Sequence, residues 1–101
     1  MSALGSDSPV DPKYEKLYQL LLQEKFPLEM TIKLIGRNTL EFAAGLDRFE
    51  GEHPGIGRIK ERKSQGDRYL SVTYQLLVSS ALHAVALFER AALVPHVEVV
   101  L

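Results

Sequence analysis

The 101-residue sequence contains no cysteine and no tryptophan. Without cysteine, the chain cannot build a disulfide framework, a cysteine-ligated zinc site or a thiol nucleophile. Long apolar runs are also absent, and no apolar stretch follows a basic start, so we expect neither a membrane span nor a signal peptide. A cytoplasmic location is consistent with these absences.

A strong charge of one sign is lacking as well. Twelve Lys and Arg residues stand against thirteen Asp and Glu residues, which gives a net charge of −1. Dedicated nucleic-acid-binding domains are usually strongly basic, so this balance disfavours that class. With 46% hydrophobic and 25% charged residues the composition is typical of a soluble globular protein, and the length suits one domain.

The amino-terminal region divides into a tail and a helix. Residues 1–10 are mostly small and polar without periodicity, which predicts a disordered tail. Residues 11–25 predict a helix, because Asp11 suits the N-cap and Pro12 suits the first helical position. The helix must bury an apolar stripe, within the domain or against a partner. Its members are Tyr14, Leu17, Tyr18, Leu21 and Leu22.

A strand and a second helix are predicted next. Residues 28–35 alternate between apolar and polar side chains, as a half-buried strand does. Gly36 and Arg37 would then form a turn. Asn38 would cap the following helix, with Glu41 at the capping-box spacing. The buried stripe of that helix is Phe42, Ala43, Leu46 and Phe49.

The second half of the chain predicts a hairpin, a helix and a last strand. Residues 58–64 are mostly charged, with Ile59 as the only apolar member, which suits a strand at a sheet edge. Residues 65–67 form the hairpin turn, and residues 68–78 form the longest strand. One of the serines at 79–80 would cap the last helix, and residues 96–101 would form a short strand. The expected core side chains are Leu70, Val72, Tyr74, Leu76 and Val78 on the long strand, and Ala81, Ala84, Val85, Phe88 and Ala92 on the helix.

This order of elements predicts an α+β fold. A helix followed by β-α-β-β-α-β indicates a ferredoxin-like sandwich with an extra N-terminal helix. The four strands would form an antiparallel sheet in the order 4-1-3-2, and the two later helices would cover one face. Residues 11–101 would then form a single domain.

Five short blocks stand in order along the chain: Phe26-Pro27, Lys33-Leu34-Ile35-Gly36, His53-Pro54-Gly55, Ser-Gln-Gly-Asp-Arg-Tyr-Leu-Ser-Val at 64–72, and Val-Glu-Val-Val-Leu at 97–101. Together they resemble the YbeD-like family of small bacterial proteins of unknown function, over roughly residues 17–101. The chain departs from that family in its glycine-rich stretch at 50–58 and in its longer N-terminal helix.

The resemblance implies a ferredoxin-like fold close to the ACT-type regulatory domains. It also implies a cytoplasmic bacterial protein without established catalytic activity, so no catalytic residues are brought over. Gene neighbourhoods in that family point towards lipoate attachment. By analogy with ACT-type domains, a homodimer is a further expectation.

The first candidate site is the predicted turn formed by Gly36, Arg37 and Asn38. A helix N-terminus offers free backbone N–H groups and a partial positive charge, which suit a carboxylate or a phosphate. Arg37 would add a mobile charge. The resemblance adds that ACT-type domains place their effectors near the corresponding loop. The alternative is a tight turn and a helix cap without a ligand.

The second candidate is the sheet face away from the two later helices. Residues 58–68 hold five Lys and Arg residues against two acids, a local charge of +3. This pattern favours an anion or partner surface, or simply a solvated edge strand. RNA binding is the weakest reading, because Tyr69 is the only predicted stacking residue on that face. The proposed surface residues are Lys33, Arg58, Lys60, Arg62 and Tyr69.

No catalytic or metal motif is evident. The three histidines, His53, His83 and His96, lie too far apart in sequence for a local metal motif. We therefore expect no enzyme activity, no metal and no cofactor. The leading hypothesis is an ACT-like regulatory module that binds a small acidic metabolite or modulates a partner enzyme, with a link to lipoate. The alternatives are a protein-interaction module and, last, a single-stranded nucleic-acid binder.

Overall fold

The computed structural model describes residues 8–101, so most of the predicted tail lies outside the described residues. Val10, at the end of that segment, is half-buried against the core. The elements are a 3₁₀ helix Pro12–Tyr14, α1 Glu15–Leu21, β1 Leu28–Arg37, α2 Leu40–Glu52, β2 Gly57–Lys63, a 3₁₀ turn Gln65–Asp67, β3 Tyr69–Val78, α3 Ala81–Ala91 and β4 Val97–Val100.

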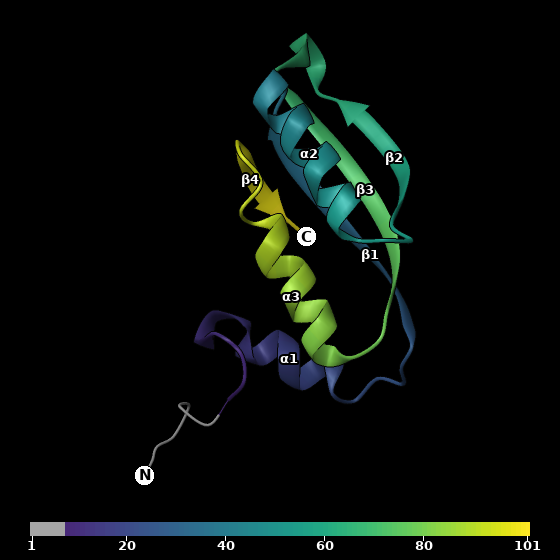
Figure 1. Cartoon of the computed structure of the whole chain (residues 1–101). Coiled ribbons are helices and arrows are strands. Elements are labelled where there is room, and N and C mark those ends of the chain that lie inside the picture. Colours follow the sequence, from purple (N-terminus) through teal and green to yellow (C-terminus); the bar gives the residue numbers. More distant parts are fainter. Residues whose placement is uncertain (1–7) are drawn as a thin grey trace.

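One four-stranded antiparallel sheet organises the fold. Its order is β2-β3-β1-β4, which reads 4-1-3-2 from the β4 edge. The central pair, β1 and β3, runs in unbroken register from Leu28 opposite Val78 to Arg37 opposite Tyr69. Helices α2 and α3 cover the same face of the sheet, and α1 packs against α3 (Figure 1). The opposite side is called the open face below.

The core lies between the sheet and these helices. The strict alternation predicted for the two long strands is confirmed, because every second side chain of β3 is buried and β1 points Ile32 and Leu34 inward. Helix α2 contributes the predicted Phe42, Leu46 and Phe49, all at most 1% exposed. The side chains that line the helix-covered face of the two strands are Leu28, Met30, Ile32, Leu34, Leu70, Val72, Tyr74, Leu76 and Val78.

The N-terminal helix is shorter than the predicted 11–25. Asp11 does act as a cap, since its carboxylate accepts a hydrogen bond from the Lys13 amide at 3.0 Å, but only a 3₁₀ turn follows. The α-helical part is Glu15–Leu21. Beyond it the Gln23 amide donates three residues back, to the Leu20 carbonyl, which tightens the chain into a turn. Leu22 therefore leaves the buried stripe.

The predicted turn at Gly36 and Arg37 is also wrong. Both residues belong to β1, where they lie opposite Leu70 and Tyr69 of β3. The strand continues two residues further than the alternation suggested, so the helix cap moves by one. Thr39, and not Asn38, accepts the capping hydrogen bond, from the Phe42 amide at 3.1 Å.

The buried face of the last helix differs slightly from the predicted one. Ser80 is its cap, accepting from the His83 amide at 3.0 Å. Ala81, Ala84 and Val85 are buried as expected. Ala92 is exposed, whereas the interior positions near the end of the helix are Leu87 and Ala91. Residues 84–88 are apolar on every side, so periodicity alone could not choose the buried face.

Candidate functional site: the open face of the sheet

A β-bulge divides the charged edge strand β2. Arg58 lies opposite Tyr74 and Lys60 lies opposite Thr73, so Ile59 is an extra residue without a partner. A bulge of this kind changes the side to which the following side chains point. Lys60 is thereby placed on the open face, as predicted. Arg58 instead joins the helix-covered face, so its assignment to the open surface was wrong.

Arg58 is held on that face by a compact polar cluster. Its Nε donates to Glu50 Oε2 on α2 at 3.0 Å, and its guanidinium also pairs with Glu61. The same guanidinium lies 5.8 Å from the centre of the Tyr74 ring. The Tyr74 hydroxyl donates to Glu50. The cluster links the edge strand β2 to α2. The positive charge of Arg58 is compensated by the carboxylates of Glu50 and Glu61.

The Tyr74 phenol is strongly perturbed by this setting. Burial raises its pKa well above the usual value, and the hydrogen bond to Glu50 acts in the same direction. The ring is fully covered by its neighbours. A raised pKa means that the folded state favours the neutral phenol. This preference contributes fully to the free energy of unfolding below the unfolded-state pKa of about 10. The contribution is lost progressively as the pH rises from there towards the pKa of the folded state.

Replacing Tyr74 with phenylalanine tests this assignment. The free energy of unfolding at pH 7 should fall by roughly 1.5–3 kcal/mol, because the hydrogen bond to the Glu50 carboxylate is lost. Above about pH 10, where the phenol ionises in the unfolded chain, the wild type should lose stability more steeply than Tyr74→Phe. Urea unfolding at pH 7, 10 and 11 measures both effects, with Tyr18→Phe as the control. Equal alkaline slopes in wild type and Tyr74→Phe would contradict the assignment.

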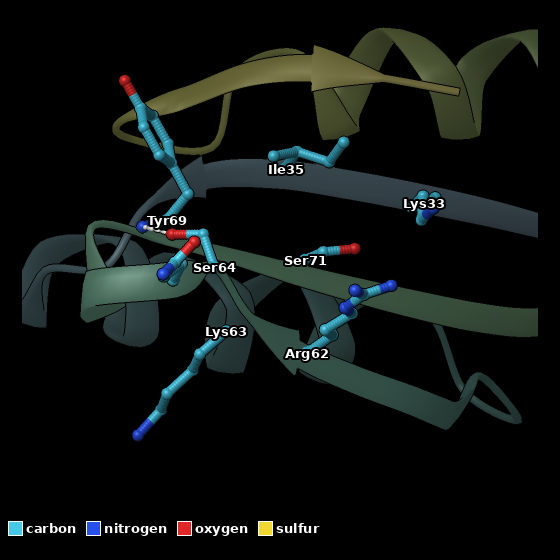
Figure 2. A pocket seen from close by; sticks show the side chains of 8 residues that line it. Lys33, Ile35, Arg62, Lys63, Ser64, Tyr69 and Ser71 are labelled. Carbon is cyan, nitrogen blue, oxygen red and sulfur yellow. Dashed lines mark hydrogen bonds between the residues drawn. The ribbon is translucent and has the colours of Figure 1, made fainter.

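On the open face, side chains from β1, β2 and β3 surround a hollow of about 390 Å³, called here the cationic hollow (Figure 2). Among residues 8–101, three cations and no acid line it. Lys33 and Arg62 come from the strands on either side of β3, where Arg62 lies opposite Ser71 and Lys33 lies opposite Thr73. The lining residues are Lys33, Ile35, Arg62, Lys63, Ser64, Gln65, Tyr69 and Ser71.

The hairpin end of the hollow is fixed by Ser64. Its backbone N–H donates to the Tyr69 carbonyl, and its hydroxyl accepts from the Tyr69 N–H, both at 3.0 Å. Gly66 in the turn has a φ of 81°, a conformation that favours glycine. Lys63 extends away from the hollow, which leaves Lys33 and Arg62 as the two cations that face it (Figure 2).

The residues of the first candidate site, Gly36, Arg37 and Asn38, do not form a helix N-terminus. The Arg37 and Asn38 amides already donate to the carbonyls of His96 and Arg68, at 3.0 and 2.9 Å. Gly36 is buried beneath them. These backbone groups are therefore not free to receive an anion.

The Arg37 side chain instead lies at the margin of the open face. Its guanidinium is 5.7 Å from the centre of the Tyr69 ring, and its Nε is 3.3 Å from Glu98 Oε2. A second hollow of about 400 Å³ beside it is lined in part by Glu98. The carboxylate already there makes this second hollow the poorer anion site.

A model of the family described as "Protein of unknown function (DUF493)" matches residues 23–101. The chain belongs to this family. It is the same family as the YbeD-like proteins that the sequence blocks resemble. Comparison of this DUF493 chain with curated proteins and with solved structures gives no significant match.

The sequence did not identify all the residues that line the cationic hollow of this DUF493 protein. Ser64 was assigned only to the edge strand and Gln65 only to the hairpin turn, although both line the hollow. Ile35 could have been found, because the alternation that turns Leu34 inward must turn Ile35 to the open face. Lys60 lies on that face opposite Thr73 but outside the hollow.

Among residues 8–101, no three His, Asp or Glu side chains gather closely enough to hold a metal ion. The helices of the same region are all too short or too polar to cross a bilayer.

Proposed function

We propose that this DUF493 protein is a non-catalytic regulatory module that binds a small molecule bearing a carboxylate or a phosphate. The binding site is the cationic hollow. The observation on which this rests is that Lys33 and Arg62, from the strands on either side of β3, line one hollow in which no acid of residues 8–101 takes part. The four-stranded α+β fold and the resemblance to ACT-type regulatory domains support the regulatory part of the proposal.

The chemistry of the hollow suits an oxyanion. Arginine offers a planar fork of donors that matches a carboxylate or a phosphate, while lysine offers a mobile point charge. Neither Arg62 nor Lys33 has an ion-pair partner within residues 8–101, in contrast to Arg58 and Arg37. Their charges are therefore available to a ligand. Ile35 and Tyr69 add apolar surface for the remainder of the molecule.

Loss of the two cations should weaken binding sharply. Each charge-assisted hydrogen bond is worth roughly 1.5–3 kcal/mol, so the double variant Lys33→Gln/Arg62→Gln should bind about a hundredfold more weakly or worse. Calorimetric titration would use phosphate, citrate, glutamate, AMP, lipoate and octanoate. The last two are included because of the family's gene neighbourhoods.

A charge-matched variant provides the control for that titration. Lys16→Gln/Lys25→Gln removes the same charge from exposed positions in the N-terminal segment and should leave the affinity unchanged. The proposal fails if none of the six compounds binds at millimolar concentration, or if both double variants bind equally well.

Binding of a partner protein is the second candidate function. It is favoured by the edge strand β2, whose residues from Arg58 to Lys63 are all exposed. A single-stranded nucleic acid has the weakest support. Tyr69 is the only aromatic side chain on the open face of the described strands, and the Arg37 guanidinium already lies over its ring.

A further inference from the structure

The outer edge of β2 offers backbone groups to a further strand. β2 is the terminal strand of the sheet beside β3. The Ser64 amide donates inward, to the Tyr69 carbonyl. Since N–H groups alternate in direction along an antiparallel strand, those of Lys60 and Arg62 also point inward. The N–H and C=O groups of Glu61 and Lys63 therefore point away from the sheet.

The side chains along this edge have a regular charge spacing. Lys60 and Arg62 lie on the open face, opposite Thr73 and Ser71, and both are exposed. Two residues of a strand span about 6.6 Å. An extended peptide with acids at every second position has the same spacing. Such a peptide could place its carboxylates beside these two cations on one face of the sheet.

The same charges discourage pairing with a second copy of this chain. Two β2 strands laid edge to edge would bring Lys60 and Arg62 of one copy against like charges of the other, which is unfavourable. The stretch of β2 that can pair regularly with another strand is limited at one end by the bulge at Ile59 and at the other end by the hairpin turn. Four residues, Lys60 to Lys63, remain open to a strand of opposite charge.

We propose that β2 receives an extended acidic segment of a partner protein as a fifth strand of the sheet. The main chain of the segment would bond to Glu61 and Lys63, and alternate acidic side chains would lie beside Lys60 and Arg62. This inference does not depend on the small-molecule site. The two share Arg62, but Lys60 lies outside the hollow and Lys33 is two strands away from the edge.

Two synthetic peptides of equal composition test the strand geometry. One is Glu-Thr-Glu-Thr-Glu-Thr and the other is Glu-Glu-Glu-Thr-Thr-Thr. The alternating peptide should bind about tenfold more tightly in a fluorescence anisotropy titration, because only it places its carboxylates on one face. It should also slow amide hydrogen exchange at Glu61 and Lys63, measured by NMR. A version methylated on its backbone nitrogens should not slow that exchange.

Point variants separate this site from the cationic hollow. Lys60→Gln should weaken the alternating peptide and leave small-anion binding unchanged, whereas Lys25→Gln should change neither. Equal affinity for the two peptides would overturn the proposal, since it would show attraction by charge alone. Unchanged exchange at Glu61 and Lys63 would overturn it too. Peptide-induced changes confined to Lys33 and Ser71 would instead assign the carboxylates to the hollow.

Discussion

Replacing Gly36 with alanine should destabilise the protein by about 3 kcal/mol, at the upper end of what overpacking a filled core usually costs. A Cβ at this position would lie 2.7 Å from Cε1 of Phe42 and 2.8 Å from the carbonyl oxygen of His96. The oxygen belongs to the backbone that leads into β4, so it cannot rotate away. For a domain of this size the melting temperature should fall by roughly 15 °C.

Gly57→Ala is the matched control for Gly36→Ala. Gly57 also lies in a strand, but the nearest atom to its added Cβ is the Gln75 carbonyl oxygen, at 4.0 Å. The change should be neutral or slightly stabilising. If thermal unfolding showed equal losses for both variants, the close packing of β1, α2 and β4 around Gly36 would be refuted.

Alanine substitutions at two glycines of α2 should change the free energy of unfolding in opposite directions. At Gly45 the new methyl group would lie 2.7 Å from Cδ of Pro95 and 2.9 Å from Cγ1 of Val94, so we expect a loss of about 2 kcal/mol. At Gly51, apart from the adjacent residues and the backbone of α2 itself, no atom of the described residues lies within 4 Å of the added Cβ. Alanine there should add roughly 0.5–1 kcal/mol, the usual gain of alanine over glycine in a helix.

Urea unfolding of Gly45→Ala and Gly51→Ala measures this difference directly. Both variants make the same chemical change in the same helix, so helix propensity largely cancels between them. What remains is the contact of α2 with the segment before β4. Two gains of similar size would show that this segment does not pack against Gly45.

The sequence was most informative where one local rule decides the outcome. Residues 28–35 and 68–78 alternate because one face of each strand is buried, and that period can be read without knowing the neighbours. A serine cap at 79 or 80 and the turn at residues 65–67 were likewise predicted from local chemistry, and the structure identifies Ser80 as the cap. The helix-covered face of the sheet was therefore predicted almost residue by residue.

The caps and the strand ends depended on distant partners. Thr39 and Asn38 are both good capping residues, and the choice between them depends on how far β1 extends. That length is set by pairing of Gly36 and Arg37 with β3, β4 and the turn before β4. No local pattern contains this information, so the turn predicted at Gly36 and Arg37 was wrong.

The candidate surface was predicted only in part for the same reason. Lys33, Lys60, Arg62 and Tyr69 lie on the open face, as the alternation suggested. Arg58 does not, because the bulge at Ile59 places it on the opposite face from Lys60, where it contacts Glu50 on α2. The Arg37 side chain reaches that face through Tyr69, whereas the sequence had assigned it to a separate site.

The bulge in β2 also has an evolutionary consequence. The ladder passes from Arg58–Tyr74 to Lys60–Thr73 with Ile59 to spare, so β2 is one residue longer than its pairing requires. If the Ile59 codon were lost, all the remaining residues of β2 would keep their present partners on β3. If the Glu61 codon were lost, Lys60 would move to the position opposite Val72 and Ile59 to the position opposite Thr73. The Lys60 side chain would then point to the helix-covered face. In this strand the position of a deletion, more than the identity of the lost residue, decides which face keeps its charge.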